Sequence, residues 1–83
     1  MALKKVTYEE ALVELVDIID EIRQWEYYAD QLKENINKLE NFEAPKKIID
    51  ATKDEYDEVI SNIHELKEVY EAQKKYCKQR GWI

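Results

Sequence analysis

Four acidic residues at helical spacing are the side chains of this sequence whose type and pattern are best suited to chemistry. They stand at steps of four, three and four residues: Glu10, Glu14, Asp17 and Glu21. In a helix this spacing places all four in one column. Carboxylate oxygens are preferred magnesium ligands, but a magnesium site needs several of them to converge on one point. A column on one exposed face spreads out, so the sequence favours a solvated acidic face over a metal site.

Acidic clusters on paired helices are similar to the magnesium sites of the all-α nucleoside-triphosphate pyrophosphohydrolases, whose helical dimers are of comparable size. That family pairs two glutamates and places a third glutamate three residues later. Here Glu9 and Glu10 are followed by Val13 at that position. The resemblance implies a metal-dependent nucleotide hydrolase, which remains an alternative to the non-enzymatic function that we favour.

The single histidine and the single cysteine indicate no further reactive site. His64 follows a predicted core position and should face solvent, and a zinc site needs further histidine or cysteine ligands. Cys77 falls on a predicted core position, where cysteine packs as a small apolar residue. One glycine in the whole chain leaves no Gly-rich phosphate loop. We therefore predict no catalytic, cofactor-binding or metal-binding residue.

Two heptad patterns of apolar residues predict the elements that carry these side chains. Apolar residues alternate at steps of three and four, the pattern of a helix that packs lengthwise on another helix. We call these positions the seam: Tyr8, Ala11, Leu15, Ile18, Ile22, Trp25, Ala29, Leu32, Ile36 and Leu39, then Ile49, Thr52, Tyr56, Val59, Ile63, Leu66, Tyr70, Gln73 and Cys77. With 39% charged residues, one Gly and one Pro in 83 residues, the composition is also that of long helices.

Capping and turn signals divide the chain. Thr7 and Glu10 form a capping box, and Asn41 is suited to the left-handed conformation that ends helices. Pro45 fits the first position of a second helix, and Gly81 can end it, leaving Trp82 free to pack back on the last turn. The expected elements are helix 8–40, turn 41–44, helix 45–80 and tail 81–83.

A second capping box, Thr52 to Glu55, leaves open a later start of the second helix, near Lys53. We prefer one continuous helix because the seam keeps its phase through Ile49 and Thr52. A short connection makes neighbouring helices antiparallel. The sequence therefore predicts one all-α domain, residues 1–83, folded as a long antiparallel two-helix hairpin.

Apolar residues beside the seam predict a partner. Most of them collect at the open end of the hairpin, where both termini lie: Leu12, Val16, Ile19, Val69, Tyr76 and Trp82. One antiparallel helix cannot cover all of these side chains, and a symmetric dimer is the commonest way to do so. We expect a homodimeric four-helix bundle with this interface.

The net charge of −6 is unevenly spread along the chain. Residues 8–30 hold eight acids and only Arg23 as a base, whereas bases collect near the chain ends, as at Lys4 and Lys5. This predicts an acidic belt around the middle of the hairpin and argues against direct nucleic-acid binding. We favour a small cytoplasmic interaction module, such as a regulator, inhibitor or assembly factor, with no membrane contact. The alternative is an acidic nucleic-acid mimic that inhibits a nucleic-acid-binding protein.

Overall fold

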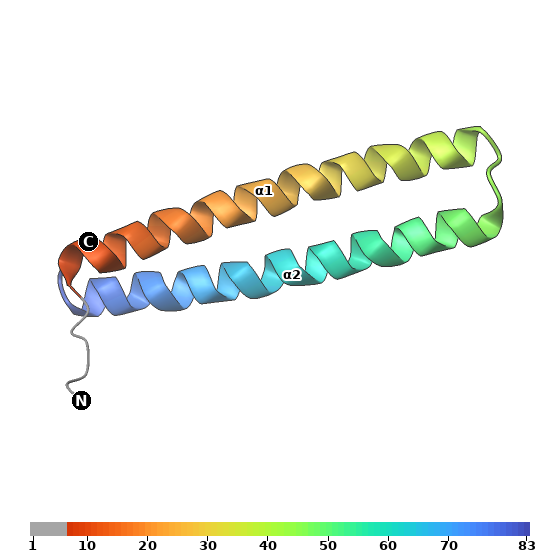
Figure 1. Ribbon diagram of the computed structural model, residues 1–83. Coiled ribbons are helices and arrows are strands. Elements are labelled where there is room, and N and C mark those ends of the chain that lie inside the picture. Colours follow the sequence, from red (N-terminus) through yellow and green to blue (C-terminus); the bar gives the residue numbers. More distant parts are fainter. Residues whose placement is uncertain (1–6) are drawn as a thin grey trace, which may run out of the picture.

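The computed structural model describes residues 7–83 as two long helices lying side by side (Figure 1). Helix α1 spans Tyr8–Asn41 and helix α2 spans Lys46–Gln79, with 34 residues in each. The helices run antiparallel, so the start of α1 and the end of α2 lie together at the open end. The predicted all-α antiparallel hairpin is confirmed, and no strand occurs in the described range. Lys4 and Lys5, counted among the basic residues at the chain ends, lie outside that range.

Thr7 caps the start of α1 as the sequence predicts. The Glu10 backbone N–H donates a hydrogen bond to the Thr7 hydroxyl oxygen over 3.2 Å, which satisfies one of the free amide groups of the first turn. Glu9 and Glu10 add negative charge there, and this charge stabilises the positive end of the helix dipole. Local chemistry therefore fixes where the helix begins.

Both helices end in the same backbone motif. At the end of α2, Gly81 has φ +73°, and the Trp82 N–H donates to the Cys77 carbonyl over 2.9 Å. At the end of α1, Glu43 has φ +53°, and the Ala44 N–H donates to the Leu39 carbonyl over 3.0 Å. These are Schellman motifs, in which the residue after the C-cap residue adopts a left-handed conformation.

The left-handed residue at the turn therefore differs from the expectation. Helix α1 continues through Asn41, which moves the left-handed position two residues on, to Glu43. Helix α2 starts at Lys46 and is continuous, so no separate start occurs near Lys53. The Thr52 hydroxyl, which a capping box would direct at an amide, instead donates to the Ile48 carbonyl over 2.9 Å.

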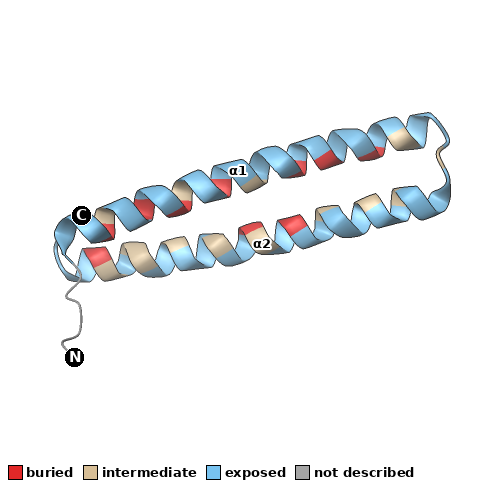
Figure 2. Ribbon diagram, viewed as in Figure 1, coloured by how far each residue is buried: buried red, intermediate tan, exposed pale blue. Residues whose placement is uncertain are grey.

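The seam forms the core along the whole hairpin. Every seam residue after Tyr8 is buried or half-buried, whereas Tyr8 at the open end is 49% exposed (Figure 2). The central part of the core consists of Ala29, Leu32, Val59 and Ile63, with Trp25 and Tyr56 against them. Helix α1 contributes most of the buried residues because its seam carries mainly small and aliphatic residues, whereas tyrosines, Thr52 and Gln73 interrupt the seam of α2.

A single layer of two helices leaves both broad sides of the hairpin open to solvent. The molecule measures 58 × 27 × 15 Å, and its radius of gyration is 18.3 Å. A compact chain of 83 residues has a radius of gyration of about 12 Å. The core is therefore thin, and the two broad sides are the surfaces on which a partner can lie. Neither helix contains a stretch that is long and apolar enough to cross a membrane, as far as residues 7–83 show.

Candidate interaction surfaces

Three of the six predicted interface residues pack within the hairpin itself. Leu12, Tyr76 and Trp82 lie against the buried cluster of Ala11, Leu15 and Cys77 at the open end. All three are half-buried without any second chain. They therefore contribute first to the stability of the hairpin.

Aromatic rings close this open end. The Trp82 ring meets Tyr8 edge-on at a centroid distance of 6.1 Å and Tyr76 at 5.9 Å. The Arg80 guanidinium lies 4.9 Å from the Tyr76 ring centroid and 5.8 Å from that of Trp82. Such edge-on and cation–π contacts add stabilisation beyond the buried area. The backbone motif at Gly81 turns the chain so that Trp82 lies on this cluster.

The other three predicted residues divide between the two broad sides. Val16 and Val69 are 55% and 51% exposed, and Ile19 is half-buried. Ile19 lines a shallow groove together with Ile22 and Tyr70, whereas Val69 lines a different groove with Trp25 and Leu66. The structure thus separates residues that the sequence pattern placed in one patch.

The seam gives a simple rule for these two sides. In both helices, the residue directly after each seam residue points to one side, and the residue directly before it points to the other. Interhelical contacts agree with this rule. Glu26 and Lys67, which both follow seam residues, form an ion pair of 3.7 Å, and Glu40 and Lys53 form another of 3.8 Å.

The side formed by the following residues is the mixed-charge side. Its acids and bases nearly balance: Glu9, Glu26, Asp30, Glu40, Asp50, Asp57 and Glu71 against Arg23, Lys33, Lys53, Lys67, Lys74 and Lys78. Its apolar members are Leu12, Val16, Ile19 and Ile60. Both ion pairs that join α1 to α2 in the described chain lie on this side.

The side formed by the preceding residues is the acidic side. It holds seven acids and one base: Glu10, Glu14, Asp17, Glu21, Glu55, Glu58 and Glu65 against Lys38. Hydrogen bonds take the place of ion pairs between the helices here. The Tyr28 hydroxyl donates to the Glu55 carboxylate, and the Gln73 amide donates to Glu14 over 3.4 Å. The bond to Glu55 raises the pKa of the Tyr28 hydroxyl above its ordinary value.

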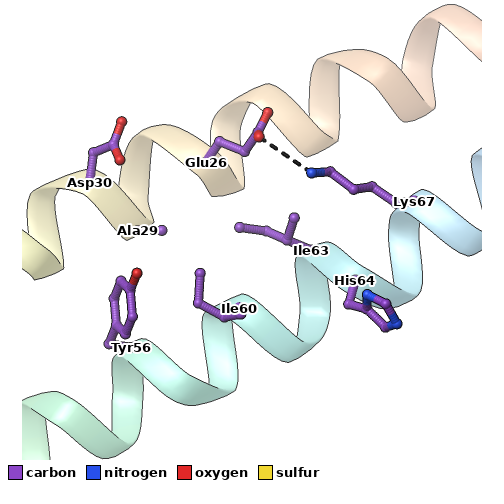
Figure 3. A pocket seen from close by; sticks show the side chains of 8 residues that line it. All are labelled: Glu26, Ala29, Asp30, Tyr56, Ile60, Ile63, His64 and Lys67. Carbon is purple, nitrogen blue, oxygen red and sulfur yellow. Dashed lines mark ion pairs between the residues drawn. The ribbon is translucent and has the colours of Figure 1, made fainter.

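Shallow grooves with apolar floors run along the mixed-charge side. One is lined by Ala29, Tyr56, Ile60 and Ile63, with His64 and the Glu26–Lys67 ion pair at its rim (Figure 3). The next, which contains Ile19, shares Glu26 and Lys67 with the first, so the two grooves follow one another along the hairpin with this ion pair between them. On the acidic side, Glu21 and Glu65 line the same groove as Val69. The apolar surface there is bordered by like charges.

The candidate reactive residues do not form a site. Across residues 7–83, no three His, Cys, Asp or Glu side chains come close enough to hold a metal ion. His64 is exposed and pairs with Glu68 at 3.3 Å, one helical turn away. Cys77 is fully buried within the cluster at the open end. The column of acids stays on the acidic side as a linear array.

The two sides differ in charge although acids are spread along both helices. The acid excess that predicted a belt lies mainly on one side of the hairpin. The residue before each seam position and the residue after it already carry this signal in the sequence.

Fold and surface together define a two-helix antiparallel hairpin with one mixed-charge and one acidic side. A comparison with models of known protein families, with curated proteins and with solved structures found no match to this chain.

Proposed function

We propose that this chain is a small protein–protein interaction module that acts as a homodimer through its helical surfaces, without catalysis. The observation that carries the proposal is the apolar surface left on a hairpin whose seam is already filled. Val16 is 55% exposed and Ile60 is 42% exposed. Ile60 lines one shallow groove with an apolar floor, and Val16 lies one helical turn before Ile19, which lines the next groove. Full burial of such a side chain stabilises an assembly by about 1.5–3 kcal/mol.

The shape of the hairpin supports the same proposal. A layer 15 Å thick buries its seam between two helices only, so its core stays close to water on both broad sides. A second hairpin laid on one side would complete a four-helix bundle and cover the groove floors. A bundle of this kind suits a regulator, inhibitor or assembly factor that binds by surface complementarity.

Light scattering of the purified chain over a range of micromolar concentrations tests the homodimer. We expect twice the chain mass of 10.0 kDa and a melting temperature that rises with protein concentration. A chain mass of 10.0 kDa with a melting temperature independent of concentration would contradict the homodimer.

The acidic side favours a second candidate function, which is docking on a basic protein surface. Seven acids against one lysine give this side the charge that such a surface attracts. Mimicry of nucleic acid fits less well. Glu10 to Glu21 place four acids over about 16 Å of helix axis at ~1.5 Å per residue, or about one charge per 5 Å. Duplex DNA has one charge per ~1.7 Å, so this array is too sparse to imitate it closely.

Salt dependence of partner binding tests the second candidate. A partner purified with the chain from its host should bind more weakly as ionic strength rises, because exposed charges are screened. Replacing Glu14, Glu21 and Glu65 with glutamine should weaken the same binding. Affinity that changes with neither salt nor these substitutions would contradict docking through the acidic side.

A further inference from the structure

We infer that a second copy of this chain docks on the mixed-charge side, and that the acidic side of each copy stays on the outside of the dimer. The inference rests on the proposed self-association and names its surface. Val16, Ile19 and Ile60 form the apolar part of the contact.

Charge decides between the two sides. In a symmetric dimer the same surface lies on both copies, so each side must be complementary to itself. Contact through the acidic side brings seven acids against another seven, within the ~8 Å over which charges interact at physiological salt. The mixed-charge side brings seven acids and six bases against the same set, and these can pair across the contact. Only the mixed-charge side is self-complementary.

The apolar residues of the two sides lie among different charges. On the mixed-charge side, Ile19 and Ile60 line grooves whose floors include Ile22 and Ile63, which are 8% and 6% exposed. A docked helix covers these floors together with Val16. On the acidic side, the exposed Val69 shares its groove with Glu21 and Glu65, and burial would remove both carboxylates from water.

The mixed-charge side is also large enough. A stable interface buries about 800 Å² on each partner. The broad side of the hairpin is 58 Å long and up to 27 Å wide, so a second hairpin lying along it meets that requirement without help from the ends.

A matched pair of valine substitutions tests the surface. Val16 and Val69 have the same side chain and nearly equal exposure, 55% and 51%, on opposite sides of the hairpin. We expect Val16→Glu to raise the dimer dissociation constant about a hundredfold, because the contact loses two buried valine side chains and would have to bury two carboxylates in their place. Val69→Glu should leave the dissociation constant within a few-fold of the parent value. Sedimentation equilibrium measures both, and circular dichroism confirms that each variant keeps its helix content.

A second variant tests whether the effect at position 16 depends on the sign of the introduced charge. Val16→Lys should also dissociate the dimer, because either charge is unfavourable at an apolar contact. A parent dimer that Val69→Glu dissociates and Val16→Glu does not would overturn the inference while leaving the homodimer intact. A parent monomer would overturn the homodimer itself, so the two failures are distinguishable.

Discussion

The two broad sides of the hairpin share one seam and one backbone geometry, yet they differ in charge. The mixed-charge side has seven acids against six bases, whereas the acidic side has seven acids against a single lysine. Exposed apolar residues occur on both, with Val16 on one side and Val69 on the other. Apolar content therefore does not distinguish the sides. The charges around the exposed apolar residues determine which side is complementary to the same side of a second copy.

Single residues of the seam also differ in burial. Ile63, which lines a groove on the mixed-charge side, is 6% exposed, whereas Leu66, which lines a groove on the acidic side, is half-buried.

The largest expected effect is on the core. Ile63→Ala should lower the free energy of unfolding by about 2–5 kcal/mol, the usual cost of removing a buried aliphatic side chain. Leu66→Ala should cost less, because Leu66 is half-buried beneath the acidic side. Urea unfolding followed by circular dichroism at one protein concentration measures both.

Glu34→Ala is the control for these two variants, since Glu34 is exposed and pairs only with Lys38, one turn away. It should change the free energy of unfolding by less than about 0.5 kcal/mol. Equal losses for Ile63→Ala and Leu66→Ala would contradict the difference in burial between these two residues.

The open end should give the next largest effect. Trp82→Ala should lower the free energy of unfolding by about 1–2 kcal/mol, less than for a fully buried tryptophan, because Trp82 is half-buried. The oligomeric mass should not change, because Trp82 packs on Tyr8 and Tyr76 of its own chain. Thermal unfolding and light scattering check the two outcomes. A variant that is equally stable but monomeric would place Trp82 in the interface instead.

Neutralising one acid on each side should change stability in opposite directions. Glu21→Gln should raise the melting temperature slightly, because it relieves repulsion with Glu65 across the acidic groove. Glu26→Gln should lower it slightly, because it removes the ion pair with Lys67. Each substitution should change the free energy of unfolding by a few tenths of a kcal/mol. The change should shrink as salt is added, since all four side chains are exposed. Changes of the same sign in low salt would contradict the assignment of charge to the sides.

The smallest effect concerns the Tyr28 hydroxyl on the acidic side. Its pKa is raised by the hydrogen bond to Glu55, so the folded chain favours the protonated form. The stabilisation of the folded chain by this hydrogen bond is complete below the ordinary tyrosine pKa of about 10. It is lost as pH rises through the higher pKa that Tyr28 has in the folded chain. Tyr28→Phe should remove one late-titrating tyrosine from an ultraviolet absorbance titration. An unchanged late phase would show that Tyr28 and Glu55 do not interact in solution.

The hairpin could be predicted because a seam of nineteen positions is a strong signal. Each position from Ala11 to Cys77 is buried or half-buried as expected, and Thr7 and Gly81 have the predicted capping roles. Apolar residues at alternating steps of three and four, held over many turns, leave few alternative folds. The charge difference between the sides was readable from the same seam, by taking the residues directly before and after each position.

Other features depend on three-dimensional detail that spacing does not contain. The sequence does not show that Trp82 lies between Tyr8 and Tyr76, because this follows from the direction in which the Gly81 turn sends the chain. The left-handed position of Glu43 depends equally on where α1 stops. For the same reason, spacing alone does not show that Leu12, Tyr76 and Trp82 pack on the core at the open end. Val16, Ile19 and Val69 lie on the broad sides instead.

Distances between spin labels on two copies of the chain show which side of the hairpin lies at the dimer contact. Arg23 and Gln24 are adjacent and exposed, but Arg23 lies on the mixed-charge side and Gln24 on the acidic side. Each is replaced with cysteine in a Cys77→Ala background and labelled, and the distance between copies is measured by pulsed electron spin resonance. We predict a shorter distance for the label at 23, because labels at 24 are separated by the thickness of both hairpins. A shorter distance for the label at 24 would contradict docking through the mixed-charge side.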